Sequence, residues 1–251
     1  MLSIIHLSIS NDLIRMSVIV KIIYVSLACI GSYLLGSIPT SVWLGRLLKG
    51  RDVREHHTRN PGGMNAIRTF GLAFGTIVLF IDCFKGTLTI ALIDQLFSLD
   101  YFVTSDGSNI IHTILCIIGP ALAIFGHVYP FWLKFDGGQG LGVFMGTIMY
   151  VNPLVLWVYF FGFIFLTLVF KMPVRRVGTI VVLVCIPAAL FMPLAPPWSS
   201  ILSDMAFGPY NFFHLTQGLI VAAMDLALLS RLIENILKGS AQGKKTGTEI
   251  G

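Results

Sequence analysis

Long apolar runs alternate with short polar connections along most of the chain. A helix that crosses a bilayer needs about 20 predominantly apolar residues, and the pattern predicts seven such stretches. The first contains Gly36 to Pro39, where proline must break or kink the helix because it lacks a backbone donor. The predicted stretches are about 18–44, 70–96, 110–125, 141–150, 154–170, 177–192 and 215–232.

Basic residues alternate between the connections that join these stretches. Lys or Arg follow the first, third, fifth and seventh stretches and are absent after the second, fourth and sixth. Because Lys and Arg mark cytoplasmic loops, we predict an all-α integral membrane protein. Its seven transmembrane helices form one bundle, with the N-terminus outside and the C-terminus cytoplasmic. Arg15 and Lys21 are exceptions, since they fall on the outer side.

The chain divides into three predicted parts. Residues 1–16 lack the basic segment and the small-residue cleavage site of a signal peptide. They are interpreted as an N-terminal extension, with Met16 as an alternative start. Residues 17–240 are predicted to form the seven-helix membrane domain, and residues 241–251 a cytoplasmic tail.

Composition agrees with a membrane protein. Charged residues make up 12% of the 251 residues and the mean hydropathy is +0.84, whereas a soluble domain carries about 25% charged residues. The basic residues behind the net charge of +5 are split among several connections, so no nucleic-acid binding is expected. The cysteines are predicted to be small core residues, without a disulfide framework or a zinc site. They are Cys29, Cys83, Cys116 and Cys185.

The connection from Arg46 to Arg68 is rich in arginine, asparagine and glycine. Guanidinium groups bind phosphate oxygens through paired hydrogen bonds. Gly62 and Gly63 leave backbone N–H groups accessible to an anion, and Asn60 and Asn65 offer donors and acceptors. The connection therefore favours an anion site, with an ordinary polar turn between helices as the alternative.

The connection from His127 to Gly140 is expected at the same cytoplasmic face. Its glycines precede a helix whose free N–H groups and dipole favour phosphate. The spacing of Gly142 and Gly146 is equally typical of close helix packing, and both interpretations stay open. His127 is a candidate general acid or base, or a structural histidine.

Asp82 and Lys85 lie three positions apart on one predicted helix, so they are expected to pair. Ionisable groups at membrane depth are costly and usually functional. Several catalytic motifs are absent from the sequence, including Gly-x-Ser-x-Gly, the Walker loop and His-Glu-x-x-His. No His is followed five positions later by Asp, the pattern of the acyl-CoA-dependent glycerolipid acyltransferases.

In order and spacing, these motifs resemble those of the bacterial membrane acyl-phosphate:glycerol-3-phosphate acyltransferases. The likeness covers about Gly31 to Glu249. At three places the chain departs from the family pattern, since His57-Thr58-Arg59 replaces Gly-Ser-Gly, Gln139 replaces a lysine and Leu232 replaces a histidine. The matching stretches are Gly36–Asn65, Asp82–Gly86, Gly126–Gly140, Arg231–Ile236 and Gly247–Glu249.

The resemblance implies transfer of a fatty acyl group from acyl phosphate to the 1-hydroxyl of glycerol 3-phosphate. This reaction gives lysophosphatidate in the first step of phospholipid synthesis, at the cytoplasmic face of the cell membrane. The implied partners are the two substrates and the lipid bilayer; no metal or cofactor is implied, and the chain is expected to be a monomer. The implied catalytic residues are Ser37, Asn60, Lys85 and His127. The implied substrate-binding residues are Arg46, Arg54, Thr58, Gly62, Asn65, Arg68, Asp82, Gly137, Gly138, Gln139, Gly140 and Asn235.

Two other functions stay open at this point. One is a non-catalytic or altered paralogue that binds acyl phosphate or phospholipid, because Gln139 and Leu232 depart from the family pattern. The other is a small-anion transporter, since broken helices with ionisable residues also suit transport, although no inverted repeat is visible. If the chain is an active acyltransferase, Arg59 is expected to supply the charge that Gln139 lacks.

Overall fold

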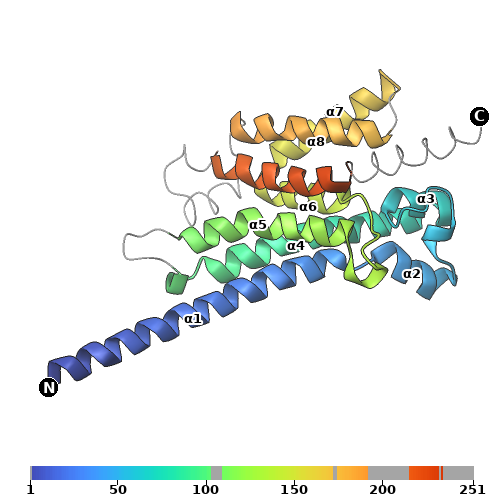
Figure 1. The fold of residues 1–251 in the computed structure, drawn as a ribbon. Helices are drawn as coiled ribbons and strands as arrows, with labels where there is room; N and C mark the ends of the chain where they lie inside the picture. Colours follow the sequence, from blue (N-terminus) through green and yellow to red (C-terminus); the bar gives the residue numbers. More distant parts are fainter. Residues whose placement is uncertain (1, 103–108, 172–173, 192–214, 232, 234–251) are drawn as a thin grey trace, which may run out of the picture.

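The computed structural model describes residues 2–102, 109–171, 174–191, 215–231 and 233. Within these ranges every regular element is helical, and the long helices lie alongside one another (Figure 1). Residues 215–231 form a helix after α8. The labelled elements are α1 (Leu2–Ser37), α2 (Thr40–Lys49), η1 (Val53–Glu55), α3 (Gly63–Phe70), α4 (Leu72–Phe97), η2 (Asp100–Phe102), α5 (Ile110–Val128), η3 (Phe131–Leu133), α6 (Leu141–Val151), α7 (Pro153–Leu168) and α8 (Val174–Phe191).

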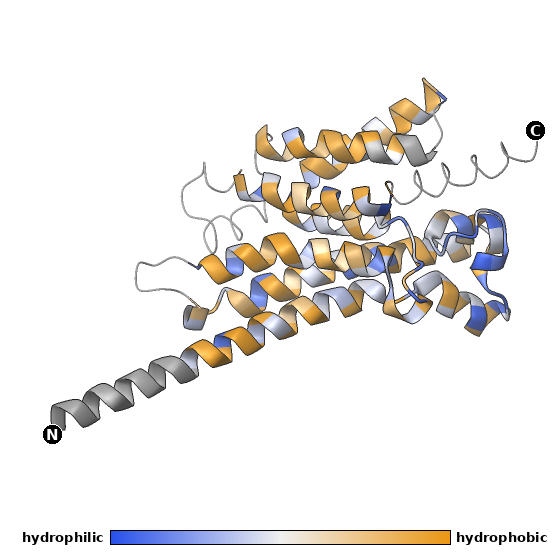
Figure 2. Cartoon of the chain, viewed as in Figure 1, coloured by the Kyte–Doolittle hydropathy of each residue, from blue (hydrophilic) through white to orange (hydrophobic). Residues whose placement is uncertain are grey.

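Three helical segments, Ser17–Ser37, Leu72–Phe97 and Ile110–Leu133, are long and apolar enough to cross a membrane. Apolar residues cover the long helices, and hydrophilic residues concentrate at the end of the bundle that holds α2 and α3 (Figure 2). The protein is therefore an all-helical, multi-pass integral membrane protein. Each of the seven predicted stretches holds a helix, but not every one is long enough to span. With 11 residues, α6 rises only about 16 Å, half of a hydrocarbon core of about 30 Å.

The predicted break in the first stretch is confirmed at Ile38 and Pro39. There α1 ends at Ser37, and α2 begins at Thr40 as a separate helix. Of the two predicted outcomes the helix breaks rather than kinks, and the predicted extent of the first span to Leu44 is wrong, because the apolar span ends at Ser37. Pro39 cannot donate the hydrogen bond that would continue α1. The polar connection that follows is more structured than expected, since it contains η1 and α3.

Glycines bring the backbones of α4 and α6 into contact. A Cβ atom at Gly86 would collide with the carbonyl oxygen of Val143, and one at Gly146 with the carbonyl oxygen of Cys83. The Thr87 hydroxyl donates to the Gly146 carbonyl oxygen at 2.7 Å. The packing interpretation of Gly146 is confirmed, and α4 and α6 hold a fixed spacing on either side of the site described next.

The cysteines follow the sequence prediction in part. Cys116 and Cys185 are buried, Cys29 and Cys83 are half-buried, and all four are free. Cys116 and Cys185 belong to the main apolar core, which joins α4, α5, α6, α7, α8 and the helix at 215–231. One cysteine is not an isolated core residue, however, because Cys116 contacts the imidazole of His112.

Candidate active site

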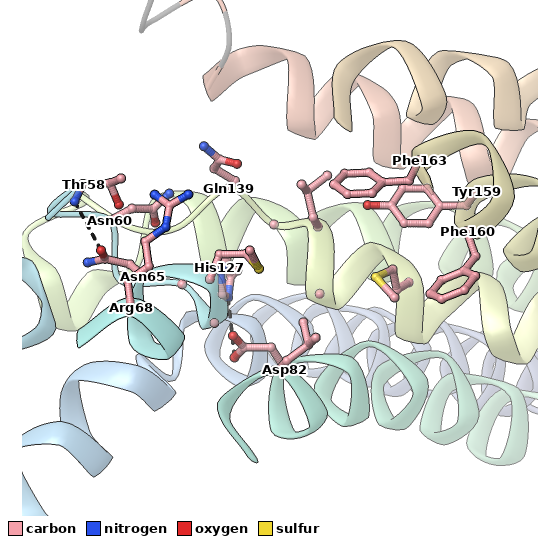
Figure 3. Close-up of a pocket in the computed structure, with 18 residues that line it drawn as sticks. Thr58, Asn60, Asn65, Arg68, Asp82, His127, Gln139, Tyr159, Phe160 and Phe163 are labelled. Carbon is pink, nitrogen blue, oxygen red and sulfur yellow. Dashed lines mark hydrogen bonds and ion pairs between the residues drawn. The ribbon is translucent and has the colours of Figure 1, made fainter. Parts of the chain in front are cut away.

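The two polar connections predicted from the sequence line one cavity of about 360 Å³. One end of this cavity is polar and the other is apolar (Figure 3). A space with this division suits an amphiphilic molecule. The polar side chains at the wall are Thr58, Asn60, Asn65, Arg68, Asp82, His127 and Gln139, and the apolar ones are Met64, Leu79, Leu141, Met145, Tyr159, Phe160 and Phe163.

Asp82 is the centre of a buried polar group at the cavity wall. Its Oδ1 atom lies 2.7 Å from Lys85 Nζ and accepts a hydrogen bond from Thr40 Oγ1 at 2.9 Å. His127 Nδ1 lies 4.0 Å from the same oxygen. The predicted pairing of Asp82 and Lys85 is confirmed, and the pair extends to the helix break and to α5.

Lys85 also binds the backbone at the proline break, at a carbonyl that accepts a hydrogen bond from Thr40 N as well. Its ammonium donates to the Ile38 carbonyl oxygen at 2.8 Å, and its side chain is only 3% exposed. Lys85 is not among the residues that line the cavity. Lys85 therefore affects the cavity indirectly, by holding Asp82 and the backbone that follows α1 in place.

The glycine loop folds back onto the end of α5. Gly137 N donates to the Val128 carbonyl oxygen and Gly138 N to the His127 carbonyl oxygen, each at 3.0 Å. A Cβ atom at Gly138 would collide with the His127 ring, so this position requires glycine. These two N–H groups are already bonded within the protein. The first intrahelical bond of α6 runs from Phe144 N to the Gly140 carbonyl oxygen, which leaves the N–H groups of 141–143 without an intrahelical acceptor. Of these residues, Leu141 and Gly142 line the cavity.

A second helix begins at the same cavity. Gly62, Gly63 and Met64 line the wall where α3 starts. Beside them, the Oδ1 atom of Asn60 is buried and has no hydrogen-bond partner among the described residues. A buried acceptor without a partner is costly, so Asn60 is well suited to accept a hydrogen bond from a bound molecule.

Asn65 has a different role. Its amide nitrogen donates to the carbonyl oxygens of Val53 at 2.9 Å and His56 at 3.2 Å. Its Oδ1 atom accepts from the backbone N–H of Thr58 at 3.2 Å. Although Asn65 lines the cavity, its amide holds the loop in shape.

Arg46 and Arg54 bind Asp52, and neither lines the cavity. Arg46 Nη2 and Arg54 Nη2 each lie 2.8 Å from Asp52 Oδ2. The hydrogen bonds from Arg54 lower the pKa of the Asp52 carboxyl to about 2, against the opposing effect of burial. The guanidinium at the cavity wall belongs to Arg68.

Four further residues named from the sequence lie away from the cavity or outside the described residues. The Ser37 hydroxyl donates to the Leu34 carbonyl oxygen at 2.9 Å, and it faces a small hollow behind His127. Arg59 is exposed, with a left-handed φ of 57°, and does not line the cavity. The expectation that it acts beside Gln139 is therefore not met. Asn235 lies outside the described residues, as does Leu232.

The structure adds residues that sequence reasoning missed. Thr40 could have been noticed as the hydroxyl that follows the Gly-Ser-Ile-Pro motif, and Asp52 as the acid between two arginines. Tyr159, Phe160 and Phe163 reach the cavity from α7. Their run of apolar residues has no signal that separates a ligand wall from a lipid-facing surface.

Comparison with known proteins points to one family. The family described as "Glycerol-3-phosphate acyltransferase" matches residues 26–239. Proteins with the same name include one from Acholeplasma laidlawii, 34% identical over 54% of this chain and 56% of the relative. Another, from Bacillus velezensis, is 33% identical over 64% of this chain and 78% of the relative. The chain thus spans between about half and three quarters of these two relatives.

Solved structures share the fold. The lysophosphatidic acid form of PlsY, described as an integral membrane glycerol 3-phosphate acyltransferase, aligns with a TM-score of 0.58 and 20% identity. The alignment covers 87% of this chain and 93% of PlsY. Its glycerol 3-phosphate form aligns with a TM-score of 0.53 and 22% identity, over 84% of this chain and 93% of PlsY. At this identity the likeness supports the arrangement of helices.

Proposed function

Because the chain belongs to the glycerol-3-phosphate acyltransferase family, we propose that it transfers a fatty acyl group from acyl phosphate to glycerol 3-phosphate. The products are lysophosphatidate and inorganic phosphate. The observation that best supports this function is the cavity with one polar and one apolar end. A fatty acyl phosphate has the same division between a charged head and an apolar tail.

The polar end suits two phosphate groups. Arg68 supplies a guanidinium, and the first turns of α3 and α6 supply N–H groups and the positive ends of two helix dipoles. Gln139 hydrogen-bonds a phosphate oxygen without adding charge. Leu141, Met145 and Tyr159 begin the apolar wall for the acyl tail.

The acceptor hydroxyl is placed by Asn60 and His127. Asn60 Oδ1, which lacks a partner among the described residues, accepts a hydrogen bond from the 2-hydroxyl of glycerol 3-phosphate, and this orients the proton of the 1-hydroxyl toward His127. The oxygen of the 1-hydroxyl attacks the acyl carbon, the bond from that carbon to the phosphate oxygen breaks, and phosphate leaves. His127 takes the hydroxyl proton. Asp82 and Lys85 act on this step indirectly, by holding the end of α1 and the imidazole in place.

An acyl phosphate is already activated, so positioning and charge stabilisation supply most of the catalysis. Ser37, Arg46 and Arg54 shape the site from outside the cavity. Asn235, Thr58, Gly62, Gly137, Gly138 and Gly140 stay in the proposed set of site residues.

The proposed topology keeps the sequence prediction. Residues 17–240 form a seven-helix bundle in the cell membrane, with the N-terminus outside and the cavity at the cytoplasmic face, while residues 1–16 are an extension and 241–251 a tail. The alternation of basic connections supports this orientation. The chain acts as a monomer.

The decisive experiment supplies purified protein with glycerol 3-phosphate and either acyl phosphate or acyl-CoA. Lysophosphatidate should form from acyl phosphate alone. Turnover of acyl-CoA without acyl phosphate would reject the proposed donor. If neither donor is used, while acyl phosphate still binds, the chain is the non-catalytic paralogue considered from its sequence.

A further inference from the structure

A second group of polar side chains lies on the helices of the active site, at the opposite end. Asp94 is near the end of α4, His112 is in the first turn of α5, and Cys116 follows one turn later. At 1.5 Å per residue, Asp94 lies about 18 Å along α4 from Asp82. All three are buried within the bundle, with exposed fractions of 3% or less.

The three side chains converge on one point. His112 Nε2 lies 2.9 Å from Asp94 Oδ1 and 3.5 Å from Cys116 Sγ. The ligand atoms of all three lie within 4.8 Å of one another. Tyr150, from α6, donates its hydroxyl to Asp94 Oδ2 at 2.8 Å, which fixes the carboxylate from a third helix.

We propose that Asp94, His112 and Cys116 bind a zinc ion. Tetrahedral zinc with N, O and S ligands at its usual bond lengths separates nitrogen from sulfur by about 3.5 Å and nitrogen from oxygen by about 3.3 Å. The nitrogen–sulfur distance already matches, and the 2.9 Å between Asp94 Oδ1 and His112 Nε2 has to widen by about 0.4 Å. The oxygen and the sulfur lie within 4.8 Å of each other, against about 3.6 Å on zinc, so the Asp94 and Cys116 side chains have to approach by at most about 1.2 Å. Imidazole, thiolate and carboxylate together select zinc over magnesium or calcium, which prefer oxygen ligands.

Charge balance favours the ion in this place. Zinc replaces the thiol proton of Cys116, so one proton is released on binding. The ion then carries two negative ligands, Asp94 and Cys116, and one neutral ligand, His112. The resulting complex has no net charge, which suits a buried site because isolated charges there are strongly disfavoured. One coordination position remains for water.

Position in the fold gives the ion a structural role. Asp94 belongs to α4 and His112 and Cys116 to α5, while Tyr150 ties α6 to the same carboxylate. These are the helices that carry Asp82, His127 and the start of α6 at the active site. Zinc would hold α4 and α5 together at the end of the bundle opposite the active site. The signal in the sequence is the spacing of His112 and Cys116, four residues apart on one helix face.

The test uses the full-length protein, purified without a histidine tag, freed of metal with a chelator and equilibrated with zinc chloride. Elemental analysis should find about one zinc per chain in the wild type and in Cys185→Ser, which removes a buried cysteine that does not belong to the group of Asp94, His112 and Cys116. Cys116→Ser and His112→Ala should bind at least tenfold more weakly. Zinc retained at full affinity by both variants would overturn the proposal.

Cobalt(II) gives a second measurement that does not depend on those variants folding. A chain that keeps Cys116 as its single cysteine should develop the near-ultraviolet charge-transfer absorption of a cobalt–thiolate bond, and zinc should displace it. Zinc should also raise the unfolding temperature of the wild type, as expected for a ligand that binds only the folded state. Absence of the cobalt–thiolate absorption in the folded chain would overturn the site.

Discussion

The hydroxyl of Thr40 donates a hydrogen bond of 2.9 Å to the carboxylate of Asp82, across 42 positions of sequence. This contact joins the first residue of α2 to the middle of α4. It also holds Asp82 Oδ1, the oxygen that Lys85 and His127 face.

Thr40→Val should destabilise the protein while keeping its shape. A hydrogen bond to a charged group contributes about 1.5–3 kcal/mol, and the valine leaves a buried carboxylate with one donor fewer. The matched control is Ser41→Ala, because the Ser41 hydroxyl is buried without a partner in the described part of the chain. Thermal unfolding in detergent should show a lower midpoint for Thr40→Val only. Equal losses in both variants would contradict the assignment.

Asp82 and Lys85 should behave as a coupled pair. Removing one member of a buried ion pair costs about 3–5 kcal/mol, because the other charge is left uncompensated. Lys85→Met and Asp82→Asn should each destabilise strongly, and the double variant should lose less than the sum of the two. A double-mutant cycle on unfolding free energies measures the coupling. Additive losses would show that the 2.7 Å contact contributes nothing to stability.

Asp52 should make stability depend on acid pH. Its pKa is about 2 in the folded protein and about 3.9 in an unfolded chain. A lowered folded-state pKa stabilises the protein above the unfolded value, and this stabilisation disappears as the pH falls from about 4 through 2. Asp52→Asn should therefore cost roughly 2 kcal/mol at pH 7, and its difference from wild type should vanish near pH 2. Glu55→Gln, at an exposed acidic position three residues further on in η1, is the control and should change the free energy of unfolding little.

A positive charge at position 139 should partly replace the positive charge of Arg68, because both side chains line the polar end of the cavity. Arg68→Gln should lower kcat/KM on acyl phosphate by about 10- to 100-fold, the worth of one charge-assisted hydrogen bond. Gln139→Lys should restore part of that loss in the Arg68→Gln background, since both side chains line the cavity. Arg59→Gln changes an exposed guanidinium outside the cavity and should leave kcat/KM within about twofold of wild type, a difference of about 0.4 kcal/mol. No rescue by Gln139→Lys would refute the shared role.

The proposed orientation is open to labelling with an impermeant thiol reagent in intact cells. Single cysteines at Ser105 and Ser200, in a background with the native cysteines replaced, should react from outside. A cysteine at Thr58 should react only after the membrane is permeabilised. The reverse pattern would mean that the alternation of basic connections had been misinterpreted.

Local features of the fold were predictable from the sequence because they depend on neighbouring residues. The apolar runs indicate the helices, Pro39 indicates the break, and the three-residue spacing indicates the contact of Asp82 with Lys85. Whether a proline kinks a helix or ends it is harder to predict. At Pro39 the helix ends, since α1 stops at Ser37 and α2 begins at Thr40.

Contacts between residues far apart in the sequence were harder to predict from the sequence. Residue type made Arg46 and Arg54 candidates for binding phosphate, but only the structure reveals that both bind Asp52. The same holds for Asn65, whose side-chain amide forms hydrogen bonds with the backbone of the preceding loop. The aromatic residues of α7 were missed because lipid-facing and ligand-facing apolar residues look alike in sequence.

Phe160 lines the cavity and is also 45% exposed. With the bundle placed in the membrane as proposed, we expect this wall of the cavity to open toward the lipid. The acyl donor would arrive by two-dimensional diffusion within the leaflet, while glycerol 3-phosphate arrives from water. Turnover should then follow the mole fraction of acyl phosphate among the membrane lipids rather than its bulk concentration. Diluting the donor with inert phospholipid should slow the enzyme even when the amount of donor per volume is unchanged.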